Sequence, residues 1–128
     1  MTEKIKLVRG DTKPQVKAVV KVADTGAIVS LAGATVRLLF RQLGSSTLQA
    51  TLVGTLLTGL EDEDGNVDTS PPYNVAGAGG RVAFAWGSTD LDCEDGEYEG
   101  EIKVTFGDGT KQTVYEPLKF KVRDKFGA

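Results

Sequence analysis

The sequence contains no histidine, and only one cysteine, one methionine and one tryptophan among its 128 residues. Without histidine, the usual general base of a catalytic triad is missing, and most zinc sites lose a ligand. The lone Cys93 excludes an intrachain disulfide and any C-x-x-C metal or redox motif. No serine and lysine stand at the S-x-x-K spacing of a Ser-Lys hydrolase. We therefore expect no enzyme and no cofactor.

Long apolar runs and a strong excess of one charge are also missing. Residues 1–10 lack the apolar segment of a signal peptide, and nothing approaches the ~18 consecutive apolar residues of a membrane helix. Fifteen Lys and Arg against 18 Asp and Glu give a net charge of −3, opposite to what non-specific nucleic-acid binding favours. We expect a single domain over residues 1–128, with no nucleic-acid, membrane or small-molecule partner.

The chain is rich in glycine, with sixteen, and in segments where apolar and polar residues alternate with a period of two. The clearest stretch is residues 95–110, where apolar side chains from Tyr98 to Phe106 alternate with Glu97, Glu99, Glu101 and Lys103. Gly96 and the Gly-Asp-Gly at 107–109 provide turns at its two ends. This pattern predicts a central strand with one buried face, followed by a hairpin into the C-terminal strand.

Further alternating segments predict strands along most of the chain, at residues 4–9, 15–22, 28–31, 34–43, 47–57, 81–86 and 112–123. Gly54 could mark a bulge, and Pro117 predicts that the last strand is broken or lies at an edge there. The prediction is an all-β fold, an antiparallel two-sheet immunoglobulin-like β-sandwich of about 7–8 strands, with a Greek-key barrel as the alternative. An antibody-type domain is disfavoured because the paired cysteines are missing.

The inward faces of these strands define a predicted core. Its members are Val16, Val20, Val36, Leu38, Phe40, Val82, Phe84, Trp86, Tyr98, Ile102, Val104, Phe106, Phe120 and Val122.

Residues 58–80 are the least strand-like part of the chain. An acidic segment is followed there by a Pro-Pro pair and a glycine-rich segment at 76–80, which we interpret as a long surface loop with a flexible approach to the next strand. Loops of this length are uncommon in compact domains and often carry function. The candidate contact residues in it are Glu61, Asp62, Asp64, Asn66, Asp68, Tyr73 and Asn74.

Two acidic segments are candidates for a calcium site. Asp90, Asp92 and Glu94 alternate as in an EF-hand loop, but Asp95 stands where the loop requires glycine. The acidic part of residues 61–68 fails in the same way, because Val67 takes the glycine position. We therefore predict no metal site of the EF-hand kind, and an irregular Ca²⁺ site on the loops stays open.

A cationic row at Lys119, Lys121, Arg123 and Lys125 has two interpretations. It could contact an acidic partner, or it could protect an edge strand from edge-to-edge aggregation, which alternating lysines commonly do. The second interpretation is favoured.

The order of these patterns resembles the β-sandwich domains of tailed-bacteriophage structural proteins. It is most similar to the N-terminal domain of the baseplate upper protein family and to related tail-fibre connector domains. The segments that carry the resemblance are RGDT at 9–12, LAGATV at 31–36, VAFAW at 82–86 with Asp90 after it, GEY at 96–98 and DG at 108–109.

This resemblance implies a non-enzymatic virion protein of the tail, baseplate or connector type, made in the host cytoplasm and located in the virion. It implies other virion proteins and copies of itself as partners, and it carries over no catalytic residue. The alternative is a carbohydrate-binding or adhesive module, for which Tyr73 and Tyr115 are the main exposed aromatic candidates.

Overall fold

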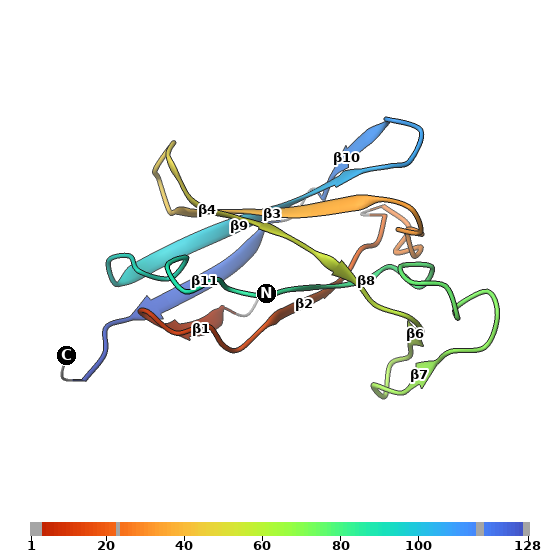
Figure 1. Cartoon of the computed structure of the whole chain (residues 1–128), viewed down its shortest axis with the longest axis horizontal. Helices are drawn as coiled ribbons and strands as arrows, with labels where there is room; N and C mark the ends of the chain where they lie inside the picture. Colours follow the sequence, from red (N-terminus) through yellow and green to blue (C-terminus); the bar gives the residue numbers. More distant parts are fainter. Residues whose placement is uncertain (1–3, 23, 115–116, 127–128) are drawn as a thin grey trace.

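The computed structural model describes residues 4–22, 24–114 and 117–126, and these residues form strands, turns and loops without a helix (Figure 1). The predicted all-β class is therefore confirmed. No helix long and apolar enough to cross a membrane is found in the described part of the chain.

The larger sheet contains the central strand that the sequence predicts. Its strands lie in the order β1 (Ile5–Val8), β11 (Leu118–Arg123), β9 (Gly96–Thr105), β3 (Thr35–Gln42) and β4 (Leu48–Val53), and β10 (Lys111–Thr113) also pairs with β9. β9 is the longest strand and pairs with β3 along eight residues. The β9–β10 hairpin closes at Phe106, whose amide donates to the Thr110 carbonyl oxygen at 2.8 Å, as the Gly-Asp-Gly turn predicts.

The smaller sheet has the order β2 (Val16–Val19), β8 (Arg81–Phe84) and β5 (Thr55–Leu56). A separate pair is formed by β6 (Leu60–Glu61) and β7 (Val67–Asp68). Several strands of the larger sheet are followed in sequence by strands of the smaller one, so the chain repeatedly crosses between layers. The arrangement is consistent with a β-sandwich.

Gly54 is one crossing point, and not the bulge that the sequence suggested. β4 before it pairs with β3 in the larger sheet, and β5 after it pairs with β8 in the smaller one. The Gly54 amide donates to the Val36 carbonyl oxygen at 2.7 Å. A Cβ at Gly54 would lie 2.5 Å from Val82 Cγ2 and 2.9 Å from Phe84 Cε1, so only glycine fits without displacing the core.

The bulge lies instead opposite Phe40 and Arg41 of β3. Phe40 pairs with Ala50 while Arg41 pairs with Leu48, so Gln49 is the extra residue of β4. One inserted residue turns the side chains before it to the other face of the sheet. Leu48 therefore lies on the outer face of the sheet, with 46% of its surface exposed, although Leu52 of the same strand is buried.

The expectation of purely antiparallel sheets is wrong at one pair, because β1 runs parallel to β11. β11 consequently lies between β1 and β9, and it is not an edge strand. Pro117 immediately precedes it, and β10 ends at Thr113, so the predicted break in the C-terminal strand is confirmed.

One hydrophobic cluster draws side chains from both sheets. All predicted core residues are buried except Phe106, which is half-buried. Phe40 lies at the centre of an aromatic group, with its ring 4.9 Å from Trp86, 4.9 Å from Tyr98 and 5.1 Å from Phe120. The core also contains buried residues outside the predicted set, namely Leu7, Leu31, Leu52, Ala83, Leu91 and Cys93.

Candidate assembly surface

Residues 58–80 leave the sandwich after β5 and return to it beside the point of departure. The Leu57 amide donates to the Arg81 carbonyl oxygen at 3.0 Å, and the Gly77 amide donates to the Leu57 carbonyl oxygen at 3.0 Å. The Arg81 guanidinium donates to the Thr58 carbonyl oxygen at 2.7 Å. Both ends of the segment are thus fixed to each other and to the smaller sheet.

The projecting part is a short β-hairpin, where the sequence predicted an irregular loop. Leu60 pairs with Asp68 and Glu61 pairs with Val67. The Asp62 side chain organises the turn, because its Oδ1 accepts from the amides of Asp64 and Asn66, each at 2.9 Å. We call residues 60–68 the acidic hairpin; it extends to the lower right in Figure 1.

The acidic hairpin carries its charge in solvent. Every residue from 61 to 70 is exposed. Within the described residues, the one cation within 4.0 Å of these carboxylates is Arg81, whose Nε lies 4.0 Å from Glu61 Oε2. The pKa of Asp68 lies below its ordinary value because the hydroxyl and amide of Ser70 donate to its carboxylate. The hairpin therefore presents a concentrated negative charge.

The predicted contact residues divide into two groups. Five lie on the acidic hairpin, namely Glu61, Asp62, Asp64, Asn66 and Asp68. Tyr73 and Asn74 lie beyond it, in the turn whose Tyr73 carbonyl oxygen accepts from the Gly59 amide at 2.8 Å. Asn74 is exposed, whereas Tyr73 is half-buried and offers less of its ring than expected. Tyr115 falls outside the described residues.

The glycine-rich end of the segment is packed, and the prediction of a flexible approach is wrong. Gly77, Gly79 and Gly80 are buried. The Gly77 carbonyl oxygen accepts from the Leu31 amide at 2.8 Å, and the Gly80 carbonyl oxygen accepts from the Val20 amide at 2.9 Å. A Cβ at Gly79 would collide with the Gly59 carbonyl, so glycine allows the two backbones to touch.

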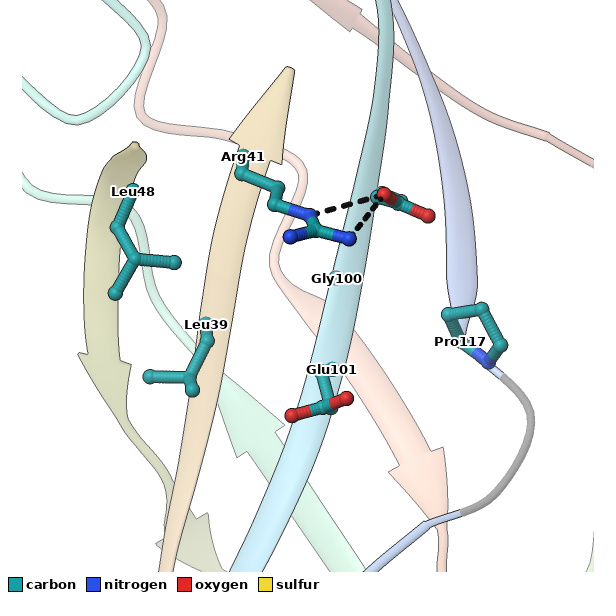
Figure 2. Close-up of a pocket in the computed structure, with 7 residues that line it drawn as sticks. Leu39, Arg41, Leu48, Gly100, Glu101 and Pro117 are labelled. Atoms are coloured by element: carbon teal, nitrogen blue, oxygen red, sulfur yellow. Dashed lines mark hydrogen bonds and ion pairs between the residues drawn. The ribbon is translucent and has the colours of Figure 1, made fainter. Parts of the chain in front are cut away.

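The outer face of the larger sheet holds a hollow that sequence reasoning missed (Figure 2). Its volume is about 320 Å³, and its lining comes from β3, β4 and β9, with Pro117 on the far side. The lining residues are Leu39, Arg41, Leu48, Glu99, Gly100, Glu101 and Pro117. Leu48 reaches this face through the bulge, for which the sequence carried no signal.

Charges on this outer face are largely paired within the sheet. Nε and Nη2 of Arg41 each lie 2.9 Å from Glu99 Oε2, as the dashed lines in Figure 2 mark. Lys119 Nζ lies 3.9 Å from the other oxygen of Glu99, and Lys103 Nζ lies 3.7 Å from Glu101. The predicted outward glutamate face is confirmed; Glu99 pairs with cations of the neighbouring strands β3 and β11, and Glu101 pairs with Lys103 of β9 itself.

The acidic side chains of Asp90 and Asp92, outside the acidic hairpin, have partners within the fold. Asp90 Oδ2 accepts from the Gly87 amide at 2.6 Å, and Asp92 lies 3.7 Å from the Arg9 guanidinium. Over residues 4–22, 24–114 and 117–126, no group of three or more His, Cys, Asp or Glu side chains is placed to hold a metal ion.

Comparison of the chain with protein-family models and with curated proteins gave no match.

Proposed function

We propose that this chain is a non-enzymatic structural protein of a tailed-bacteriophage virion, of the tail, baseplate or connector type, in which the sandwich is an assembly scaffold. The observation that carries the proposal is the way residues 58–80 are attached to the sandwich. Their ends are fixed to the sandwich by backbone hydrogen bonds, while the acidic hairpin projects into solvent. The sequence resemblance to phage sandwich domains adds the virion context.

The proposal includes an immunoglobulin-like topology, which the strand order supports. The order β2-β8-β5 corresponds to strands B, E and D of a variable-type sandwich, and the order β11-β9-β3-β4 corresponds to G, F, C and C′. In this correspondence β9 is strand F. Tyr98 near its start donates from its hydroxyl to the Glu94 carbonyl oxygen at 2.7 Å, the arrangement known as a tyrosine corner.

Other virion proteins and copies of the chain itself are the proposed partners, and the virion is the proposed location after synthesis in the host cytoplasm. Exposed loops held on a rigid sandwich are a common way to present contact residues. The contact set is that of the sequence prediction, Glu61, Asp62, Asp64, Asn66, Asp68, Tyr73 and Asn74. Five of its members share the acidic hairpin, so the hairpin is the part to remove in a test.

The test replaces residues 61–67 by Asn-Gly. Leu60 and Asp68 are paired across the two strands, so two residues can join them in a tight turn without disturbing the anchors. We expect the variant to keep the melting temperature of the parent and to be absent from purified particles. The control variant carries Asp108→Asn in the exposed turn at residues 108–109, outside the acidic hairpin, and should be incorporated as the parent is. Normal incorporation of the hairpin variant would refute the contact role, and absence of the unaltered chain from particles would refute the virion assignment.

A further inference from the structure

A second charged surface lies on the strands at the other end of the molecule. In the register of β1 with β11, Lys6 pairs with Lys121 and Val8 with Arg123, so cations of two neighbouring strands meet on the outer face. We call Lys4, Lys6, Lys119, Lys121 and Arg123 the cationic strip. A hollow of about 260 Å³ lies within it, lined by Lys6, Leu7, Val8, Lys121 and Arg123.

The nearby carboxylates neutralise only part of the charge of the cationic strip. Lys4 pairs with Glu97, and Lys119 lies 3.9 Å from Glu99, which Arg41 already contacts. The pKa of Glu97 lies below its ordinary value because Lys4 donates a hydrogen bond to it, with Lys121 and Lys119 adding attraction. Among the described residues, Lys6, Lys121 and Arg123 have no carboxylate within 4.0 Å.

The acidic hairpin carries an excess of negative charge, opposite in sign to the excess on the cationic strip. It cannot reach the cationic strip of its own chain. Figure 1 shows β6 and β7 at the lower right of the molecule, and β1 with the end of β11 at the lower left. Because the sandwich separates them, the two surfaces can only meet between different copies.

We propose that the cationic strip is the docking surface for the acidic hairpin of a second copy of this chain. The proposal deepens the proposed function, on which it rests, by naming the surface that a neighbouring copy uses. Glu63 and Asp64 at the hairpin tip are the carboxylates available to face the exposed Lys6 and Lys121, because Asp62 is held by the turn. A hairpin that binds a different surface makes a heterologous contact, which closes into rings or continues as filaments.

Contacts between exposed charges are weak individually and are screened by salt. The isolated protein should therefore associate at low ionic strength and dissociate as salt is added, and repetition of the contact in an assembly should strengthen it.

The experiment exchanges the charges of the two surfaces. One variant carries Lys6→Glu and Lys121→Glu, and the other carries Glu63→Lys and Asp64→Lys. We expect each alone to associate at least about tenfold more weakly than the parent in sedimentation velocity at low salt. Mixing them should restore association, because each surface then faces its opposite charge again.

A control variant with Lys21→Glu and Lys111→Glu makes the same change of net charge on exposed residues outside both surfaces. It should associate as the parent does; an equal loss would show a general charge effect and overturn the proposal. A monomeric parent at low salt, or failure of the mixture to associate, would overturn it as well. Binding of a poly-glutamate peptide to a monomeric parent would assign the strip to a different acidic partner.

The outcome is separable from that of the proposed function. If the chain is found in particles and the Lys6→Glu, Lys121→Glu variant is incorporated normally, the docking surface is refuted while the virion assignment stands. If the chain is absent from particles, the virion assignment fails whatever the self-association shows.

Discussion

The hydroxyl of Tyr98 donates a hydrogen bond to the backbone carbonyl oxygen of Glu94, 2.7 Å away and four residues earlier. The same ring stacks on Phe40 at a centroid distance of 4.9 Å with an angle of 9° between the ring planes. One side chain thus joins the start of β9 to both the preceding turn and the aromatic core. We expect this corner to contribute to stability through its hydroxyl as well as through its ring.

Tyr98→Phe isolates the hydroxyl, because the ring remains available for packing. We expect the free energy of unfolding to fall by about 0.5–1.5 kcal/mol, the usual net value of an intramolecular hydrogen bond. Urea denaturation followed by tryptophan fluorescence measures it. Tyr73→Phe is the control, since its hydroxyl makes no hydrogen bond among the described residues, and equal effects of the two substitutions would contradict the prediction.

The same tyrosine predicts a loss of stability in alkali. Burial raises the pKa of Tyr98 above its ordinary value of 10.0, and the neighbouring Cys93 and Glu94 add to the shift. Between the unfolded and the folded pKa, the folded chain binds more protons, so unfolding becomes more favourable as the pH rises above about 10. Below that pH, Tyr98 is protonated in both states and does not make the free energy of unfolding depend on pH.

The measurement compares the parent with Tyr98→Phe in urea at several pH values from about 8 to 11. The advantage of the parent should be constant at the lower values and shrink at the higher ones. Groups that titrate in alkali and lie away from Tyr98 are common to both proteins, so their contributions cancel in the difference. A difference independent of pH would rule out a raised pKa for Tyr98.

Gly54→Ala tests the crossing between the two sheets. The added methyl group would meet Val82 Cγ2 at 2.5 Å and Phe84 Cε1 at 2.9 Å, and it would lie 3.3 Å from the Val36 carbonyl oxygen. We expect a loss of about 1–3 kcal/mol in unfolding free energy, as for overpacked cores. Gly107→Ala is the control because its nearest neighbour would be 3.6 Å away. Equal melting temperatures of the two variants would show that the crossing tolerates a side chain.

Alternation of polar and apolar residues was sufficient to predict most strands and about two thirds of the buried core. The pattern from Tyr98 to Val104 is strictly alternating, and each apolar residue of it is buried. Period-2 alternation identifies a face because side chains of a strand point to opposite sides. It does not identify the neighbour, so the parallel pairing of β1 with β11 and the central place of β11 were not predicted.

The errors occur where one glycine or one inserted residue decides the geometry. The sequence pattern around Gly54 does not show that the chain changes sheets there. Only the contacts with Val82 and Phe84 reveal the crossing. The bulge opposite Phe40 turns Leu48 outward, and residues 77–80 read as a flexible linker until their contacts with Leu31 and Val20 are known. These features depend on tertiary contacts between distant segments, which local sequence does not encode.

The candidate site was predicted by its composition and not by its shape. Acidic residues and glycines indicated a surface segment at residues 58–80, and the carboxylates are exposed there. The hairpin itself was missed because each of its strands has two residues, too few to show a period. Its turn depends on Asp62, whose role is visible only through the two amides that it accepts from.

Asp62→Ala should therefore loosen the acidic hairpin while leaving the sandwich intact. Losing the two hydrogen bonds should cost the turn about 1 kcal/mol, which is a factor of about five in the population of open hairpin. Cleavage after Glu63 by a glutamate-specific protease should accelerate by about that factor, because nicking of a rapidly opening segment follows the open population. The melting temperature should not change, since Asp62 is exposed and far from the core. Asp62→Asn keeps an oxygen acceptor and should be cleaved at nearly the parent rate, while Asp64→Ala serves as the charge-matched control. If all three variants are cleaved alike, Asp62 does not organise the turn.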